Sequence, residues 1–219
     1  MTLHAPPPLE RPLDILTGDG GDVELREGDR LLASARAARF DAPDVPRVSY
    51  EAAAEAVGRT PYDEQTHNLP TCFVCGPARA QGDGLRIFAG PLQTASILGR
   101  PVVFAAAWVP HGSLSCEDGY VAPEFVWAAL DCPTGYCSVG ARHLGLNGDE
   151  TALLGRMAAW IDRRPRPGDR CVVAAWPTGR EGRKLFAESA LLSSEQDVLA
   201  IARTTWLLVD RQVQFGIRP

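Results

Sequence analysis

The chain has 219 residues, of which 45% are hydrophobic and 22% charged, and its formal net charge is −5. This length predicts one domain, or one domain with an appendage. The acidic balance argues against nucleic acid as a partner, because a nucleic-acid binder needs basic residues to neutralise phosphates. No apolar run reaches about 18 residues, which argues against a membrane span. The N-terminus lacks a positive patch followed by an apolar stretch, so we expect a cytoplasmic protein.

The first third of the chain is interrupted by proline and glycine. Residues 1–20 are predicted to form an irregular arm. Residues 23–26 and 31–38 flank a Glu-Gly-Asp turn and predict a β-hairpin. Ser49 is well placed to cap a short helix that runs through Val57.

The second half has a regular pattern of apolar segments separated by turns. Residues 102–109 predict a strand, and residues 121–139 predict one long helix, or two abutting ones, with Pro123 at its first position. Little of this helix is polar, as expected for a buried element. Four further strands are predicted as an antiparallel meander, at residues 153–161, 170–176, 185–192 and 198–209. The pattern predicts an α+β fold with an antiparallel sheet curled around one central helix.

Six cysteines without an export signal indicate reduced thiols. Cys72 and Cys75 form a CxxC pair. A zinc ribbon needs a second close pair, and the helical Cys132 and Cys137 are too loosely spaced to provide it. Gly76, which follows the CxxC at once, argues against a thioredoxin-type redox motif. We therefore expect a tight loop with small buried thiols, with neither a metal nor a cofactor.

Three segments carry a resemblance to a known family. Residues 72–77 (CFVCGP) and the following Gly-Leu-Arg at 84–86 resemble the opening of acyl-CoA thioesterase-like hotdog proteins. Residues 121–131 (VAPEFVWAALD) resemble the central-helix motif of the phenylacetate-pathway type of thioesterase. Residues 184–200 are similar to the closing hairpin of that family.

The resemblance implies a hotdog fold, in which an antiparallel sheet wraps around a long central helix. It assigns residues 71–219 to the hotdog domain. Residues 1–70 then form an N-terminal extension of arm, hairpin and short helix, and a degenerate half of a second hotdog unit is the alternative. The resemblance also implies a homodimer in which two sheets join edge to edge, which covers an exposed strand edge.

The start of the predicted helix departs from the family pattern. Where the family has His-Gly-Gly, this chain has Ala-Pro-Glu at 122–124. In the family a backbone N–H at this point polarises the thioester carbonyl. Because Pro123 has no N–H, the donor would be the amide of Glu124 or Phe125. The carboxylate that activates water or attacks directly in the family falls on Asp131.

Glu124, Trp127 and Asp131 are spaced i, i+3 and i+7 and therefore share one helix face. The two carboxylates lie about 10 Å apart along the axis, too far to share a proton. We take Asp131 and Glu124 as candidate catalytic residues. Two structural alternatives remain open: Asp131 caps a second short helix that begins at Cys132 or Pro133, and Glu124 only complements the helix dipole.

Trp127, Phe125 and His111 are the candidate substrate-binding residues. Trp127 and Phe125 lie on the predicted helix, and His111 follows a strand, where it can line the mouth of a pocket. The structural alternatives are a core position for Trp127 and a solvated turn for His111.

The predicted function is hydrolysis of an acyl thioester of coenzyme A or of an acyl-carrier protein. One alternative is a non-catalytic hotdog protein that binds a hydrophobic acyl or polyketide-like ligand, which the altered helix start favours. A hydratase or dehydratase ranks third, because it needs an Asp/His pair and no histidine lies near Asp131 in the sequence.

Overall fold

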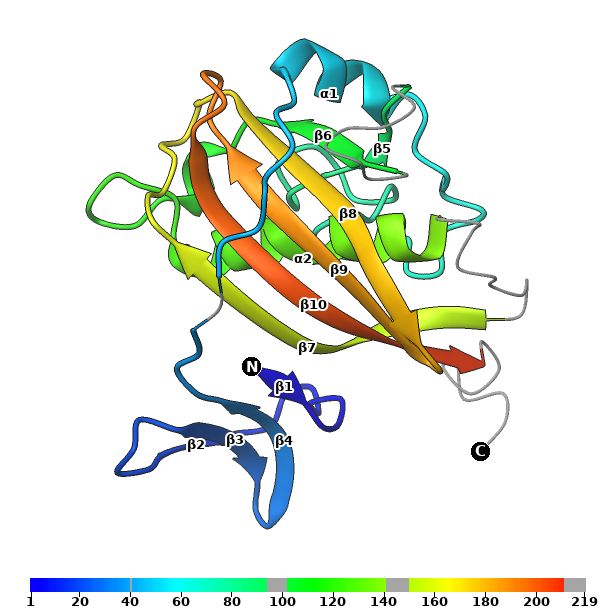
Figure 1. The fold of residues 1–219 in the computed structure, drawn as a ribbon. Coiled ribbons are helices and arrows are strands. Elements are labelled where there is room, and N and C mark those ends of the chain that lie inside the picture. The colour runs from blue at the N-terminus through cyan, green and yellow to red at the C-terminus, as the bar shows by residue number, and fades with distance from the viewer. Residues whose placement is uncertain (40, 94–101, 141–149, 211–219) are drawn as a thin grey trace.

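The computed structural model describes residues 1–39, 41–93, 102–140 and 150–210 (Figure 1). The arm and hairpin region contains four strands, β1 (Thr2–Leu3), β2 (Asp14–Thr17), β3 (Val23–Glu27) and β4 (Arg30–Ala35). The rest contains helix α1 (Tyr50–Val57), strands β5 (Gly90–Pro91) and β6 (Phe104–Trp108), a 3₁₀ turn (Gly112–Leu114), helix α2 (Pro123–Gly140) and strands β7 (Glu150–Ile161), β8 (Cys171–Glu181), β9 (Lys184–Leu192) and β10 (Val198–Asp210). None of the helices within these ranges is long and apolar enough to cross a membrane.

The strands form one ten-stranded sheet in the order β2-β3-β4-β1-β7-β10-β9-β8-β6-β5. The last three strands are antiparallel neighbours, which confirms the prediction made from their short connections. The predicted four-strand meander is wrong at its first strand, because β7 pairs with β10 and not with β8. Residues 162–170 carry the chain past β10 and β9 before β8 begins, and this link is too long for a tight hairpin.

Strand β8 is buried on both faces, and its alternating side chains enter two separate cores. Cys171, Val173 and Ala175 belong to the core beneath α2. Val172 and Trp176 belong to a smaller core that includes side chains of α1. Helices α2 and α1 therefore cover opposite faces of the sheet (Figure 1).

The local chemistry of α1 follows the sequence prediction. The Ser49 hydroxyl accepts a hydrogen bond from the Ala52 N–H at 3.2 Å, which confirms the predicted N-cap. Ala53 and Ala56 are fully buried against the sheet. The helix lies so close to β5 that a Cβ at Gly90 would be 1.9 Å from the Ala56 carbonyl oxygen.

Helix α2 is continuous through Pro133, and Pro123 is its first residue, as predicted. A proline inside a helix removes one backbone hydrogen bond. The buried Thr134 hydroxyl donates to the Asp131 carbonyl at 2.6 Å, and it accepts from Trp206 Nε1 of β10 at 2.8 Å. The Ser189 hydroxyl of β9 donates to the Leu130 carbonyl at 2.8 Å. These bonds hold the middle of the helix against the sheet.

The N-terminal strands extend the sheet beyond β7. The predicted hairpin at 23–38 is confirmed as β3 and β4. The prediction of an irregular arm is wrong at β1 and β2, because β1 pairs with β4 and β2 pairs with β3. Thr2 of β1 lies opposite Arg156 of β7, and the Met1 ammonium donates to the Met157 carbonyl at 2.8 Å. The arm becomes ordered because β7 provides unpaired backbone groups at its edge.

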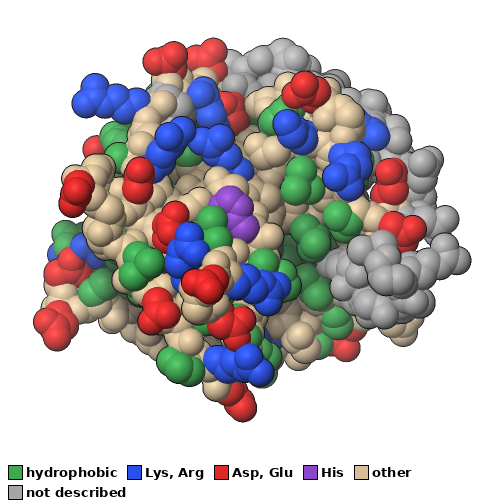
Figure 2. Space-filling view, turned by 90° about the horizontal axis from the view of Figure 1, so that it is seen from below, with side chains coloured by type: hydrophobic (Ala, Val, Ile, Leu, Met, Phe, Trp, Pro, Cys, Tyr) green, Lys and Arg blue, Asp and Glu red, His purple; other side chains and the backbone are tan. Residues whose placement is uncertain are grey.

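The surface carries charges of both signs. In the face shown in Figure 2, acidic and basic side chains are interspersed, and neither sign forms a continuous field. This distribution is consistent with the modest net charge of −5.

Candidate functional site

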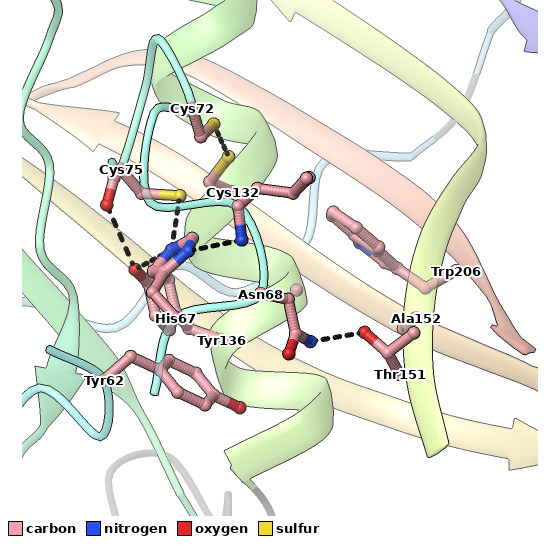
Figure 3. A pocket seen from close by; sticks show the side chains of 12 residues that line it. Tyr62, His67, Asn68, Cys72, Cys75, Cys132, Tyr136, Thr151, Ala152 and Trp206 are labelled. Carbon is pink, nitrogen blue, oxygen red and sulfur yellow. Dashed lines mark hydrogen bonds between the residues drawn. The ribbon is translucent and has the colours of Figure 1, made fainter. Parts of the chain in front are cut away.

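A cavity of about 110 Å³ lies between α2, the beginning of β7, strand β10 and the segment that contains the CxxC pair (Figure 3). Its lining is mostly aromatic and sulfur-containing. The lining residues are Tyr62, His67, Asn68, Leu69, Cys72, Cys75, Cys132, Gly135, Tyr136, Thr151, Ala152 and Trp206. None of the five residues predicted from the sequence is among them.

Three cysteines converge at one end of this cavity. The sulfurs of Cys72, Cys75 and Cys132 all lie within 4.8 Å of one another, and the Cys72 and Cys132 sulfurs are 3.7 Å apart. Cys75 is buried and the other two are half-buried. Cys72 and Cys75 come from the CxxC loop and Cys132 comes from α2. The fold therefore brings together cysteines that are more than fifty residues apart in the sequence.

The CxxC loop is a tight turn that directs backbone N–H groups at a sulfur. The backbone N–H groups of Val74 and Cys75 lie near enough to the Cys72 sulfur to lower its pKa. The Gly76 N–H donates to the Cys72 carbonyl at 2.8 Å. A Cβ at Gly76 would lie 2.5 Å from backbone atoms of Cys72 and Pro70, so only glycine fits there.

Hydrogen bonds to the sulfurs give the thiols of this cluster different pKa values. Bonds from the thiols of Cys132 and Cys75, together with the backbone N–H groups, lower the pKa of Cys72. The hydrogen bond between the Cys72 and Cys132 thiols raises the pKa of Cys132. Of these two thiols, Cys72 is therefore the more acidic.

His67 and Tyr136 form a polar contact beside the sulfurs. His67 Nε2 lies 3.3 Å from the Cys75 sulfur and 3.0 Å from the Tyr136 hydroxyl oxygen. His67 Nδ1 accepts the Leu69 N–H at 2.9 Å, so the proton of the neutral ring is on Nε2. Burial lowers the pKa of His67, which favours this neutral form. Tyr62 packs against the Tyr136 ring, with ring centroids 5.2 Å apart.

Asp131 lies in the middle of α2. The residue as a whole is only half-buried, but its Oδ1 is shielded from solvent and has no hydrogen-bond partner among the described residues. Burial, with a smaller effect from the charge of Cys72, raises the pKa of Asp131 to about 7. Because α2 continues past Pro133, the alternative in which Asp131 caps a second helix is wrong.

The start of α2 presents one free backbone donor. The Phe125 N–H donates to the Ala122 carbonyl at 3.0 Å and is therefore occupied. In the described part of the chain, the N–H of Glu124 has no such partner. Its side chain is exposed in the first turn. Of the two amides that the sequence left as candidate donors, Glu124 is the one that remains available.

The three predicted substrate-binding residues occupy different places. Phe125 is half-buried, with its ring centroid 5.9 Å from that of Phe73. Trp127 is half-buried and packs against the core beneath α2. His111 is exposed, and its Nδ1 accepts the Ser113 N–H at 3.2 Å, so it caps the 3₁₀ turn. It borders a separate, larger hollow of about 630 Å³.

Sequence reasoning missed the environment of His67 and Tyr136 and the approach of Cys132 to the CxxC loop. The only local signal was the glycine that follows the CxxC pair, which is typical of a tight turn around a sulfur. No spacing rule links that loop to a single cysteine on a distant helix, so the sequence does not predict that Cys132 lies beside Cys72 and Cys75.

Comparison with known proteins identifies the fold. No family model matches the sequence, and no curated protein matches it either. A solved thioesterase superfamily protein superposes with a TM-score of 0.50 at 12% identity, covering 63% of this chain and 60% of that protein. The fold of this chain is therefore similar to that of a thioesterase superfamily protein.

Two further solved structures are similar over a shorter part of this chain. A phenylacetic acid degradation-related protein from Ralstonia eutropha has a TM-score of 0.43 at 18% identity and covers 48% of this chain and 75% of its own. The protein smu.793 from Streptococcus mutans, solved with acetyl-CoA, has a TM-score of 0.44 at 9% identity and covers 49% of this chain and 82% of its own. The antiparallel sheet and few helices of this chain fit the predicted hotdog fold.

Proposed function

We propose that the protein hydrolyses acyl thioesters of coenzyme A or of an acyl-carrier protein, with Asp131 as the base. The observation that carries the proposal is the carboxylate oxygen in the middle of α2. It is shielded from solvent and bonded to no described residue. A buried polar atom without a partner costs stability, and such atoms are found where a substrate or water is to be bound. Its place in a thioesterase-superfamily fold supplies the reaction class.

The reaction follows from the two groups that α2 provides. Asp131 accepts a proton from water, and the water oxygen bonds to the thioester carbonyl carbon. The carbonyl oxygen becomes negative and is stabilised by the Glu124 N–H at the positive end of the helix dipole. The carbonyl then reforms as the carbon–sulfur bond breaks, and the thiolate leaves with the electron pair and takes up the proton that Asp131 had accepted. The products are a carboxylic acid and a free thiol.

The spacing on the helix is compatible with this division of roles. Residues 124 and 131 are separated by about 10 Å along the axis. Two hydrogen bonds of about 3 Å and an attack distance of about 3 Å fit within that span. The proposed reaction uses the backbone N–H of Glu124. The Glu124 carboxylate is exposed, and the proposed reaction gives it no contact with the reacting atoms.

We propose further that the active form is a homodimer, with the acyl chain bound between subunits. The support is the half-buried apolar surface of α2, which includes Trp127 and Phe125. In the described residues β1 pairs with β7 at one register position, Thr2 opposite Arg156, and a second copy would pair with β7 beyond that position. Light scattering coupled to size exclusion should give twice the chain mass.

Steady-state hydrolysis of short, long and aromatic acyl-CoAs tests the proposal. Product must be followed by chromatography, because the six free cysteines react with thiol dyes. We expect Asp131→Asn to lose about 10²- to 10⁴-fold in turnover while remaining folded, which is the usual contribution of a general base. Glu124→Gln keeps the backbone N–H and should lose less than about tenfold. Glu55→Gln, an exposed carboxylate on α1, is the matched control and should behave as wild type.

Full turnover by a folded Asp131→Asn variant would remove Asp131 from the mechanism. Binding of acyl-CoA by the wild type without turnover of any thioester would favour the non-catalytic alternative. The lyase alternative has no support in this site, because none of the described histidines hydrogen-bonds to Asp131.

A further inference from the structure

The cysteine cluster has the dimensions of a metal site. A tetrahedral zinc ion with zinc–sulfur bonds of about 2.3 Å places its sulfur ligands about 3.8 Å apart. The Cys72 and Cys132 sulfurs are 3.7 Å apart, and every sulfur pair that includes Cys75 is within 4.8 Å. An inward shift of Cys75 by less than about 1 Å completes three corners of that tetrahedron.

The loop is also prepared for metal binding before any ion arrives. The Gly76 N–H donates to the Cys72 carbonyl at 2.8 Å and closes the CxxC loop into a tight turn. Gly76 permits this turn, since a side chain there would collide with backbone. Cys132 is held on α2, whose middle is tied to the sheet through Thr134 and Trp206. The three sulfurs are thus presented by two rigid supports.

His67 completes the surroundings as a hydrogen-bond donor. Because Nδ1 accepts the Leu69 N–H, the Nε2 proton is available to the Cys75 sulfur at 3.3 Å. Donors of this kind around metal ligands orient them and tune their affinity. The three cysteines and His67 all line the cavity of about 110 Å³, which has room for a few water molecules (Figure 3).

We propose that Cys72, Cys75 and Cys132 bind one zinc ion. His67 donates to Cys75, and the fourth coordination position faces the cavity and holds an exchangeable ligand such as water. Zinc is the divalent ion that three thiolates in a tetrahedral arrangement favour. The ion would fasten the CxxC loop to α2. The proposed hydrolysis uses none of these groups as its base or as its donor to the carbonyl oxygen.

Metal analysis of the full chain tests this site directly. Protein purified with zinc and then desalted should contain about one zinc per chain. Cys72→Ser and Cys132→Ser should lose it, and Cys116→Ser, which removes a half-buried thiol outside the cluster, should keep it. Zinc should raise the melting temperature of the wild type and of Cys116→Ser only. A zinc-free wild type, or wild-type zinc content in Cys132→Ser, would overturn the proposal.

Two measurements remain decisive if the serine variants fail to fold. In wild-type protein, zinc should protect Cys72, Cys75 and Cys132 from alkylation, as read by mass spectrometry, and leave Cys116 unprotected. Cobalt should give sulfur-to-metal charge-transfer absorption of an intensity typical of three thiolates. The absence of both signals would refute the site.

The role of His67 has its own readout. His67→Asn should weaken zinc binding by about 10- to 100-fold at unchanged stoichiometry, as loss of a supporting hydrogen bond does. The ligand-field bands of the cobalt protein should keep their positions in this variant. A shift of those bands would show that His67 is itself a ligand and would overturn the assignment of an exchangeable fourth position.

Discussion

Thr134→Val tests how α2 is held against the sheet beside the proposed base. Thr134 is fully buried, and its hydroxyl accepts from Trp206 Nε1 at 2.8 Å while it donates to the Asp131 carbonyl at 2.6 Å. Valine has nearly the same shape but no hydroxyl. The indole N–H of Trp206, a residue only 9% exposed, would then have no acceptor in that position.

The expected cost can be divided between packing and hydrogen bonding. An unpaired buried donor costs about 1–3 kcal/mol of unfolding free energy, and we take about 2 kcal/mol for Thr134→Val. The matched control, Thr134→Ser, keeps the hydroxyl and loses one buried methyl group, for about 1 kcal/mol. Trp206→Phe removes the donor itself. The double variant should therefore be more stable than the sum of the single changes by about 1 kcal/mol or more.

Urea unfolding followed by circular dichroism measures these differences. With an m-value of about 2–3 kcal/mol/M, a loss of 2 kcal/mol lowers the midpoint by roughly 1 M. If Thr134→Val were as stable as Thr134→Ser, or the double-mutant cycle showed no coupling, the hydrogen bond would not hold α2 in place.

Two further predictions concern other parts of the chain. Gly90→Ala would place a Cβ 1.9 Å from the Ala56 carbonyl, so it should cost about 3 kcal/mol in the same assay. Gly20→Ala, which meets nothing within 4 Å, should change stability by less than about 0.5 kcal/mol, and an equal effect of both would contradict the close approach of α1. The Thr66 hydroxyl and then its N–H lower the pKa of Asp63 below its usual 3.8. The stabilisation from these bonds is therefore present above pH 3.8 and lost as the pH falls through the folded-state pKa, and a carboxyl titration by NMR that gave 3.8 or more would refute it.

Most of the individual elements were predictable because their signals are local. Ser49 before an alanine-rich segment predicts the start of α1, and Pro123 before an apolar run predicts the start of α2. The turns between β8, β9 and β10 lie between alternating or apolar runs and fix those pairings. The partner of β7 was not predictable, since a longer link permits several topologies and the sheet chooses among them through packing.

The features of the candidate site also differ in whether a local signal in the sequence predicts them. The sequence by itself determined that Asp131 lies on an apolar helix and that residues 72–76 form a tight turn, because helix periodicity and glycine in a turn act within a few residues. Only the tertiary structure decided that the carboxylate oxygen is shielded and that Cys132 meets Cys72 and Cys75. Both depend on which face of α2 packs on the sheet and which faces the loop. That choice is made by the burial of the whole apolar surface, and no spacing within the sequence encodes it.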